Sequence, residues 1–109
     1  MATLLQRRDL ARAERRRALY DETRRRLREH LADLVPGRRI IVFGSLTKPG
    51  VFNEASDIDL AVETEPSGTS LGWLMSELTE RLGRPVDVIL LARCRFRARI
   101  VREGEPWIC

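Results

Sequence analysis

The feature that most constrains the fold is a long, unbroken helical stretch at the start of the chain. Residues 3–35 contain neither glycine nor proline, and Pro36-Gly37 follows as a helix stop signal. Apolar or small residues recur on one helical face of this stretch, at Leu10, Ala13, Tyr20, Leu27, Leu31 and Leu34. We therefore predict one helix over residues 3–35. Arginines crowd its first half, so that half is expected either to remain solvated or to pack on another chain.

The residues after this helix alternate between strand and helix patterns. Strands are predicted at 39–43, 57–62, 84–91 and, as an edge strand that tolerates Pro106, at 105–108. Helices are predicted at 71–82, capped by Thr69 or Ser70 and ended by Gly83, and at 93–103. Residues 44–56 are predicted to form a loop with a short helical turn near 46–48. This order indicates an α/β or α+β fold with a small sheet backed by helices.

Length and composition limit the class of protein. The 109 residues suit one domain, which we divide into a helical extension (1–35) and a core (36–109). A core of this size is small, so a homodimer would add stability. No apolar run approaches the ~20 residues that span a bilayer, and no signal-peptide core is found, so we predict a cytoplasmic protein without a membrane partner. The chain has two cysteines, Cys94 and Cys109, and one histidine, His30. A single chain therefore cannot supply the four Cys or His ligands of a structural zinc site.

Charge is distributed unevenly along the chain. Residues 1–39 hold twelve arginines against six acids, residues 40–91 hold three basic residues against eight acids, and residues 92–109 hold five arginines against two acids. This pattern predicts a carboxylate-bearing centre between arginine-rich surfaces. We expect the carboxylates to bind cations and the arginines to bind phosphates or an acidic partner.

The carboxylates with the most informative spacing are Asp57, Asp59 and Asp87. Alternate residues of a strand share one face, so Asp57 and Asp59 are expected about 6.6 Å apart on the same side. Asp87 stands among apolar strand residues, where a lone carboxylate is costly unless it is paired or bound to metal. If strand 84–91 lies beside strand 57–62, all three carboxylates meet on one face. Oxygen ligands of this kind suit Mg²⁺ together with substrate phosphates, and such a set serves phosphoryl or nucleotidyl transfer.

Phosphate-binding groups follow the first predicted strand. Gly44 lets the backbone approach a phosphate closely, and the Ser45 hydroxyl and nearby amides are donors to phosphate oxygens. Lys48, the only lysine, either neutralises phosphate charge or is a solvated loop residue.

The motifs Phe43-Gly44-Ser45, Ser56-Asp57-Ile58-Asp59-Leu60-Ala61-Val62 and Val86-Asp87-Val88-Ile89 resemble the minimal nucleotidyltransferase (MNT) family of the DNA polymerase β-like superfamily. The resemblance implies a nucleotidyltransferase fold, in which Gly44 and Ser45 bind nucleotide phosphates and Asp57, Asp59 and Asp87 bind Mg²⁺. It also implies an antitoxin that transfers AMP from ATP to a tyrosine of a HEPN-family RNase toxin. Two other functions remain open. One is a non-catalytic antitoxin that masks the toxin with helix 3–35, and the other, less favoured, is a nucleic-acid binder that uses the basic ends.

Overall fold

The longest element is helix α1 (Leu4–Leu34), in a computed structural model that describes residues 3–109. Its first turn is closed by a capping box. The Thr3 hydroxyl accepts a hydrogen bond from the Gln6 N–H at 3.1 Å, and the Gln6 side chain accepts one from the Thr3 N–H at 2.9 Å. The helix ends just before Pro36, as the stop signal predicts. The prediction of a single helix is confirmed to within one residue at each end.

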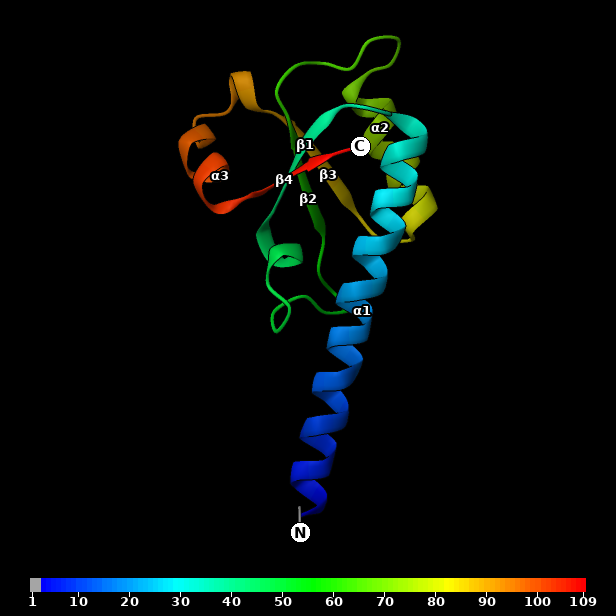
Figure 1. Ribbon diagram of the computed structural model, residues 1–109, viewed down its shortest axis with the longest axis vertical. Helices are drawn as coiled ribbons and strands as arrows, with labels where there is room; N and C mark the ends of the chain where they lie inside the picture. Colours follow the sequence, from blue (N-terminus) through cyan, green and yellow to red (C-terminus); the bar gives the residue numbers. More distant parts are fainter. Residues whose placement is uncertain (1–2) are drawn as a thin grey trace.

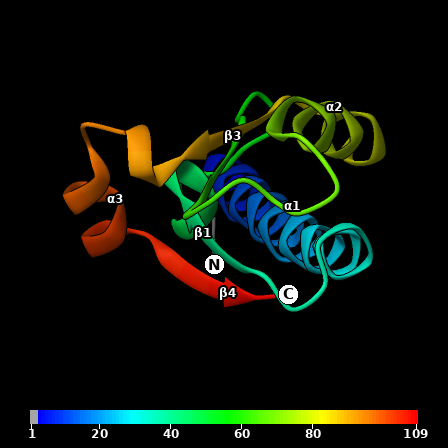
Figure 2. The ribbon, with the colours of Figure 1, turned by 90° about the horizontal axis from the view of Figure 1, so that it is seen from above.

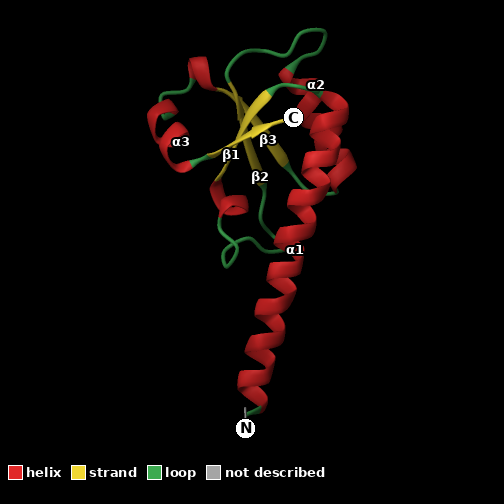
Figure 3. Cartoon of the chain, viewed as in Figure 1, coloured by secondary structure: helices red, strands yellow, loops and turns green. Residues whose placement is uncertain are grey.

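Four short strands form one mixed sheet in the order β3-β2-β1-β4, coloured yellow in Figure 3. They are β1 (Arg39–Phe43), β2 (Ile58–Val62), β3 (Val86–Leu90) and β4 (Glu105–Ile108). β1 is antiparallel to both β2 and β4, whereas β2 and β3 are parallel. β4 lies at an edge of the sheet, where Pro106 is tolerated. Strands β2 and β3 are shorter than the sequence predicted, because pairing begins at Ile58 and Val86.

Helix α2 (Leu71–Leu82) makes the crossover that a parallel β2–β3 pair requires. Ser70 caps it by accepting a hydrogen bond from the Trp73 N–H at 3.1 Å, and Gly83 ends it in the left-handed conformation. Gly83 was predicted as the end of this helix, and Ser70 was one of the two predicted caps. The remaining elements are η1 (Gly44–Thr47), η2 (Leu91–Arg93) and α3 (Arg97–Glu103). The η1 turn therefore begins two residues before the predicted turn at 46–48.

The two faces of the sheet are covered differently, as Figure 2 shows. Helices α1 and α2 pack on one face over the main core, and α3 lies on the other. On the α3 face, Ile41, Ala61, Leu91 and Ile100 form a smaller apolar cluster. This face also carries alternate residues of β2 and β3, and it remains open enough to hold a site.

The first half of α1 extends away from the sheet (Figure 1). Its buried residues begin only at Tyr20, whereas Leu10 is 60% exposed and Ala13 is also exposed. The apolar face that the sequence predicts is thus covered in the second half only. Within residues 3–109, no helix combines the length and the apolar character needed to cross a membrane.

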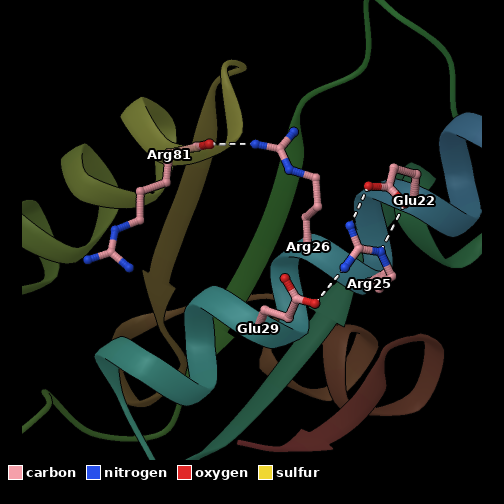
Figure 4. Close-up of polar contacts among 5 residues, drawn as sticks. All are labelled: Glu22, Arg25, Arg26, Glu29 and Arg81. Carbon is pink, nitrogen blue, oxygen red and sulfur yellow. Dashed lines mark hydrogen bonds and ion pairs between the residues drawn. The ribbon is translucent and has the colours of Figure 1, made fainter.

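Charged residues in the second half of α1 form contacts both within the helix and to other elements (Figure 4). Arg25 bonds both Glu22 and Glu29 along the helix, while Arg26 donates a 2.7 Å hydrogen bond to the carbonyl of Arg81 in α2. Arg24 reaches across to Glu105 of β4. The part of α1 from about Tyr20 onward therefore belongs to the domain, and its arginines link it to α2 and to β4.

Candidate active site

The centre of the candidate site is a pair of carboxylates on neighbouring strands. Asp59 of β2 is the register partner of Asp87 of β3. Since paired residues of adjacent strands project to the same side, both side chains lie on the α3 face. The prediction that the two acidic strands are neighbours is confirmed. Asp87 avoids the cost of burial in an apolar strand because its side of β3 is exposed.

Gly44 directly follows β1 and approaches Asp59 closely. Its φ is +73°, and a Cβ atom at this position would lie 2.5 Å from Oδ2 of Asp59. Both facts favour glycine here, since other residues rarely adopt this backbone and an added Cβ would require the Asp59 carboxylate to move. The conformation of the turn at Gly44 and the position of the Asp59 carboxylate therefore depend on each other.

These groups open into a cavity of about 520 Å³ between the sheet and α3. One end is formed by Gly44, Thr47 and Lys48, and the floor by Asp59 and Asp87. The opposite wall is formed by residues that sequence reasoning did not assign to the site, namely Cys94, Phe96, Arg99, Ile100 and Glu103. The volume of the cavity leaves room for a ligand larger than phosphate, and its lining includes an exposed aromatic ring and a guanidinium.

Asp57 lies at the border of this arrangement. β2 begins one residue later, and the exposed Asp57 lines a separate cavity of about 420 Å³ together with Asp87. Within residues 3–109, no three Asp, Glu, His or Cys side chains converge to form a ready metal site. The structure therefore brings Asp59 and Asp87 together and leaves Asp57 beside them, instead of gathering all three around one point.

The electrostatics favour a cation at the two central carboxylates. Burial raises the pKa of Asp59, and the neighbouring charges of Asp87 and Asp57 raise it further. A divalent cation would relieve this repulsion. Mg²⁺ commonly takes one or two protein carboxylates and completes its shell with waters and substrate phosphates. Asp59 and Asp87 would supply these two carboxylates, and the adjacent Gly44 turn leaves space for substrate phosphates.

The two other predicted phosphate ligands occupy different positions. Lys48 is exposed and lines the main cavity. Ser45 is half-buried in η1, where its carbonyl accepts a 3.0 Å hydrogen bond from the Lys48 N–H, and it does not line the cavity. Lys48 can therefore contact an anion bound in the cavity. The Ser45 hydroxyl can do so only if the ligand also contacts the η1 turn.

Arg84 is a positioning residue that the sequence analysis missed. Its guanidinium donates to the carbonyls of Asn53 and Ser56 at 3.1 and 2.9 Å and lies 4.7 Å from the ring centre of the buried Phe52. It thereby fastens the loop that leads into Asp57. The only signal in the sequence is that Arg84 is one of three basic residues in the acidic middle segment.

Neighbouring carboxylates can hold a divalent cation, and such cations stabilise the charge on phosphoryl oxygens in phosphoryl-transfer enzymes. The model of the nucleotidyltransferase domain family matches residues 24–106. The chain belongs to this nucleotidyltransferase domain family, as the sequence motifs predicted.

The chain is also similar to a solved structure, described as the crystal structure of the toxin-antitoxin with AMP-PNP. Sequence identity is 24%, the similar region covers 78% of this chain and 73% of the other, and the TM-score is 0.59. The likeness supports the fold. No match was found among the curated proteins.

Proposed function

We propose that this protein is a Mg²⁺-dependent nucleotidyltransferase of the antitoxin type. It transfers AMP from ATP to a hydroxyl, a tyrosine in our proposal, of a HEPN-family RNase toxin. The observation that carries the catalytic part is the juxtaposition of Asp59, Asp87 and the Gly44 turn in one cavity. A toxin partner and an adenine nucleotide are supported by the similar solved structure of a toxin-antitoxin with AMP-PNP, whereas the HEPN family and the tyrosine acceptor rest on the resemblance of the sequence motifs.

The proposed transfer needs no covalent enzyme intermediate. The acceptor oxygen attacks the α-phosphorus of ATP and forms a new P–O bond. The bond from the α-phosphorus to the oxygen that bridges it to the β-phosphorus breaks, and pyrophosphate leaves with that electron pair. The hydroxyl proton passes to a carboxylate, Asp87 in our proposal, or to water. Position and charge neutralisation account for most of the rate enhancement of such a reaction.

Each residue has a part in this proposal. Asp59 and Asp87 would hold Mg²⁺, with Asp57 next to them, and the ion would neutralise phosphate charge. The backbone turn at Gly44 and Ser45 would bind the phosphates of the leaving pyrophosphate, and Lys48 would add a positive charge to the cavity lining. The exposed ring of Phe96 provides an apolar surface on the opposite wall.

The test is transfer of label from α-labelled ATP to the partner, with Asp57 and Asp59 both changed to alanine. We expect labelling to fall to background, while circular dichroism shows an intact fold. Full labelling by the double variant would disprove the catalytic proposal. The double variant Glu63→Gln with Glu65→Gln removes two exposed acids outside the site and should label normally.

A second candidate function is neutralisation by masking, without transfer. The observation in its favour is that the family match begins at residue 24, so the projecting half of α1 is an addition to the common domain. A masking antitoxin would still inhibit the toxin when Asp57 and Asp59 are both alanine. It would lose inhibition when the arginines at 15–17 are reversed in charge.

A further inference from the structure

A further cavity, which shares no lining residue with the two described above, lies between α1 and the loop that precedes β2. Its volume is about 530 Å³. Arg12, Arg15, Arg16 and Leu19 line it from α1, and residues 53–55 line it from the loop. We call it the arginine pocket. Among its lining residues within 3–109 are three arginines and one acid, Glu54, so the lining carries a net positive charge.

The arginines of the pocket differ from those further along the same helix. Arg24 and Arg25 form ion pairs within the domain, and Arg26 bonds a backbone carbonyl. Among residues 3–109, by contrast, neither Arg12, Arg15 nor Arg16 has an acidic partner within ion-pair distance. Their charges are therefore not neutralised by ion pairs among the described residues, and they are available to a ligand.

The opposite wall of the pocket is held firmly. Phe52 is fully buried, Arg84 bonds the carbonyls on both sides of residues 54 and 55, and the Asn53 side chain accepts a 2.9 Å hydrogen bond from the Ala55 N–H. Two residues further along, the same loop delivers Asp57 to the candidate active site. A ligand in the arginine pocket would therefore contact a well-fixed loop that continues directly into Asp57.

The chemistry of the surface selects among possible occupants. A second copy of this chain would bring like charges together, which costs free energy. Proteins that bind single-stranded nucleic acids usually stack the bases on aromatic side chains. No aromatic side chain among residues 3–109 lines the pocket. The half-buried Leu19 lies beside the arginines, and the exposed Leu5 and Leu10 lie on the same helix. Arginine mixed with apolar side chains is typical of protein interfaces.

We propose that the arginine pocket docks an acidic, surface-exposed segment of the partner protein and so presents the acceptor hydroxyl to the carboxylate site. This inference rests on the proposed transfer to a protein partner and names the chemistry of that partner's contact surface. Arginine recognises carboxylates through its fork of N–H donors, which favours aspartate- or glutamate-rich segments.

The test uses the full-length protein and two labelled probes, a decaglutamate peptide and a decauridylate RNA, in fluorescence anisotropy at low salt. The variant Arg12→Glu with Arg16→Glu reverses two pocket charges. The control Arg7→Glu with Arg8→Glu makes the same charge change on the same helix outside the pocket. We expect the pocket variant to weaken peptide binding about tenfold and the control about twofold or less.

Glu54→Gln gives an independent measurement that leaves the helix unchanged, and it should tighten peptide binding. Equal loss in the pocket variant and its control, tighter binding of the RNA than of the peptide, or no peptide binding would each overturn the proposal. Stabilisation by ATP in a thermal shift assay reports on the nucleotide site. It should persist in the pocket variant, so failure of docking and failure of the proposed catalysis give different results.

Discussion

Gly44 approaches the Asp59 carboxylate so closely that an added side chain at position 44 would collide with it. A Cβ atom on Gly44 would lie 2.5 Å from Oδ2 of Asp59, and the glycine backbone has a φ of +73°. The turn after β1 is thus shaped around the carboxylate of the antiparallel neighbour β2. This contact links the proposed phosphate-binding turn to the proposed metal ligand, so a change at either residue should affect the other's function.

Gly44→Ala should therefore damage nucleotide binding as well as stability. The left-handed backbone alone is expected to cost about 1 kcal/mol, and the new methyl group must displace Asp59. Gly37→Ala is a matched control, because Gly37 has a φ of +75° and nothing within 4 Å of an added Cβ. Urea denaturation should show a loss in both variants. Calorimetric titration with a non-hydrolysable ATP analogue should show weaker binding in the Gly44 variant only, and equal affinities would contradict the proposed role of this turn.

Mg²⁺ should stabilise the protein through Asp59 and Asp87. At ten times its dissociation constant, the ion should add about 1.4 kcal/mol to the free energy of unfolding. In Asp59→Asn this gain should vanish, and the metal-free variant should exceed the metal-free wild type in stability at pH 7, because one repelling carboxylate is removed. Glu63→Gln, which changes an exposed acid just beyond β2, should retain the Mg²⁺ response. An unchanged response in Asp59→Asn would place the ion elsewhere.

The contact between α1 and β4 should make stability depend on pH. Arg24 and Trp107 both donate to Oε2 of Glu105, each at 2.5 Å. Burial raises the pKa of Glu105, but these hydrogen bonds and the charges of Arg24 and Arg28 outweigh burial, so the pKa lies below its ordinary value of 4.5. A lowered pKa means that the stabilisation is complete above pH 4.5 and is lost as the pH falls through the folded-state value.

Glu105→Gln should accordingly lower the free energy of unfolding by about 0.5–1 kcal/mol at pH 7, since the carboxylate is partly exposed. The difference from wild type should shrink as the pH is lowered below 4.5. Denaturant titrations at several pH values measure this directly. Glu29→Gln removes an exposed acid from a pair within α1 and should have little effect. A deficit in Glu105→Gln that persists unchanged at low pH would show that the ionised group does not carry the stabilisation.

Local patterns in the sequence predicted the elements well, because their causes are local. The Ser70 cap, the Gly83 stop and the alternation around Asp59 each involve residues a few positions apart. The missed features depend on residues distant in the chain. Arg84 bonds carbonyls 28 and 31 residues away, and Arg24 bonds an acid 81 residues away. No periodicity signals such contacts, and the arginine pocket likewise exists only because α1 passes the loop before β2.

Arg84 should affect acceptor use more than nucleotide affinity. Lysine keeps the charge but lacks the fork that bonds the carbonyls of Asn53 and Ser56 together. In Arg84→Lys we expect faster amide hydrogen exchange over residues 53–57 and about tenfold slower transfer to the partner. ATP affinity should stay near the wild-type value, because Gly44 and Lys48 are untouched. Arg81→Lys is the control, as its bonds to Glu77 and Asp33 lie away from the loop. An unchanged exchange rate in the Arg84 variant would contradict its positioning role.

The projecting start of α1 should be dispensable for folding. Leu4, Leu5 and Leu10 are 78%, 69% and 60% exposed, and the helix buries its first residue only at Tyr20. Removing residues 1–10 deletes the capping box but no residue of the core or of the arginine pocket. We expect the free energy of unfolding to change by about 0.5 kcal/mol or less, while circular dichroism loses the signal of the missing turns. Removing residues 1–22 takes away Tyr20 and should destabilise the domain by about 3 kcal/mol or more. A large loss from the shorter deletion would mean that the extension packs on a second copy of the chain, and it would then depend on protein concentration.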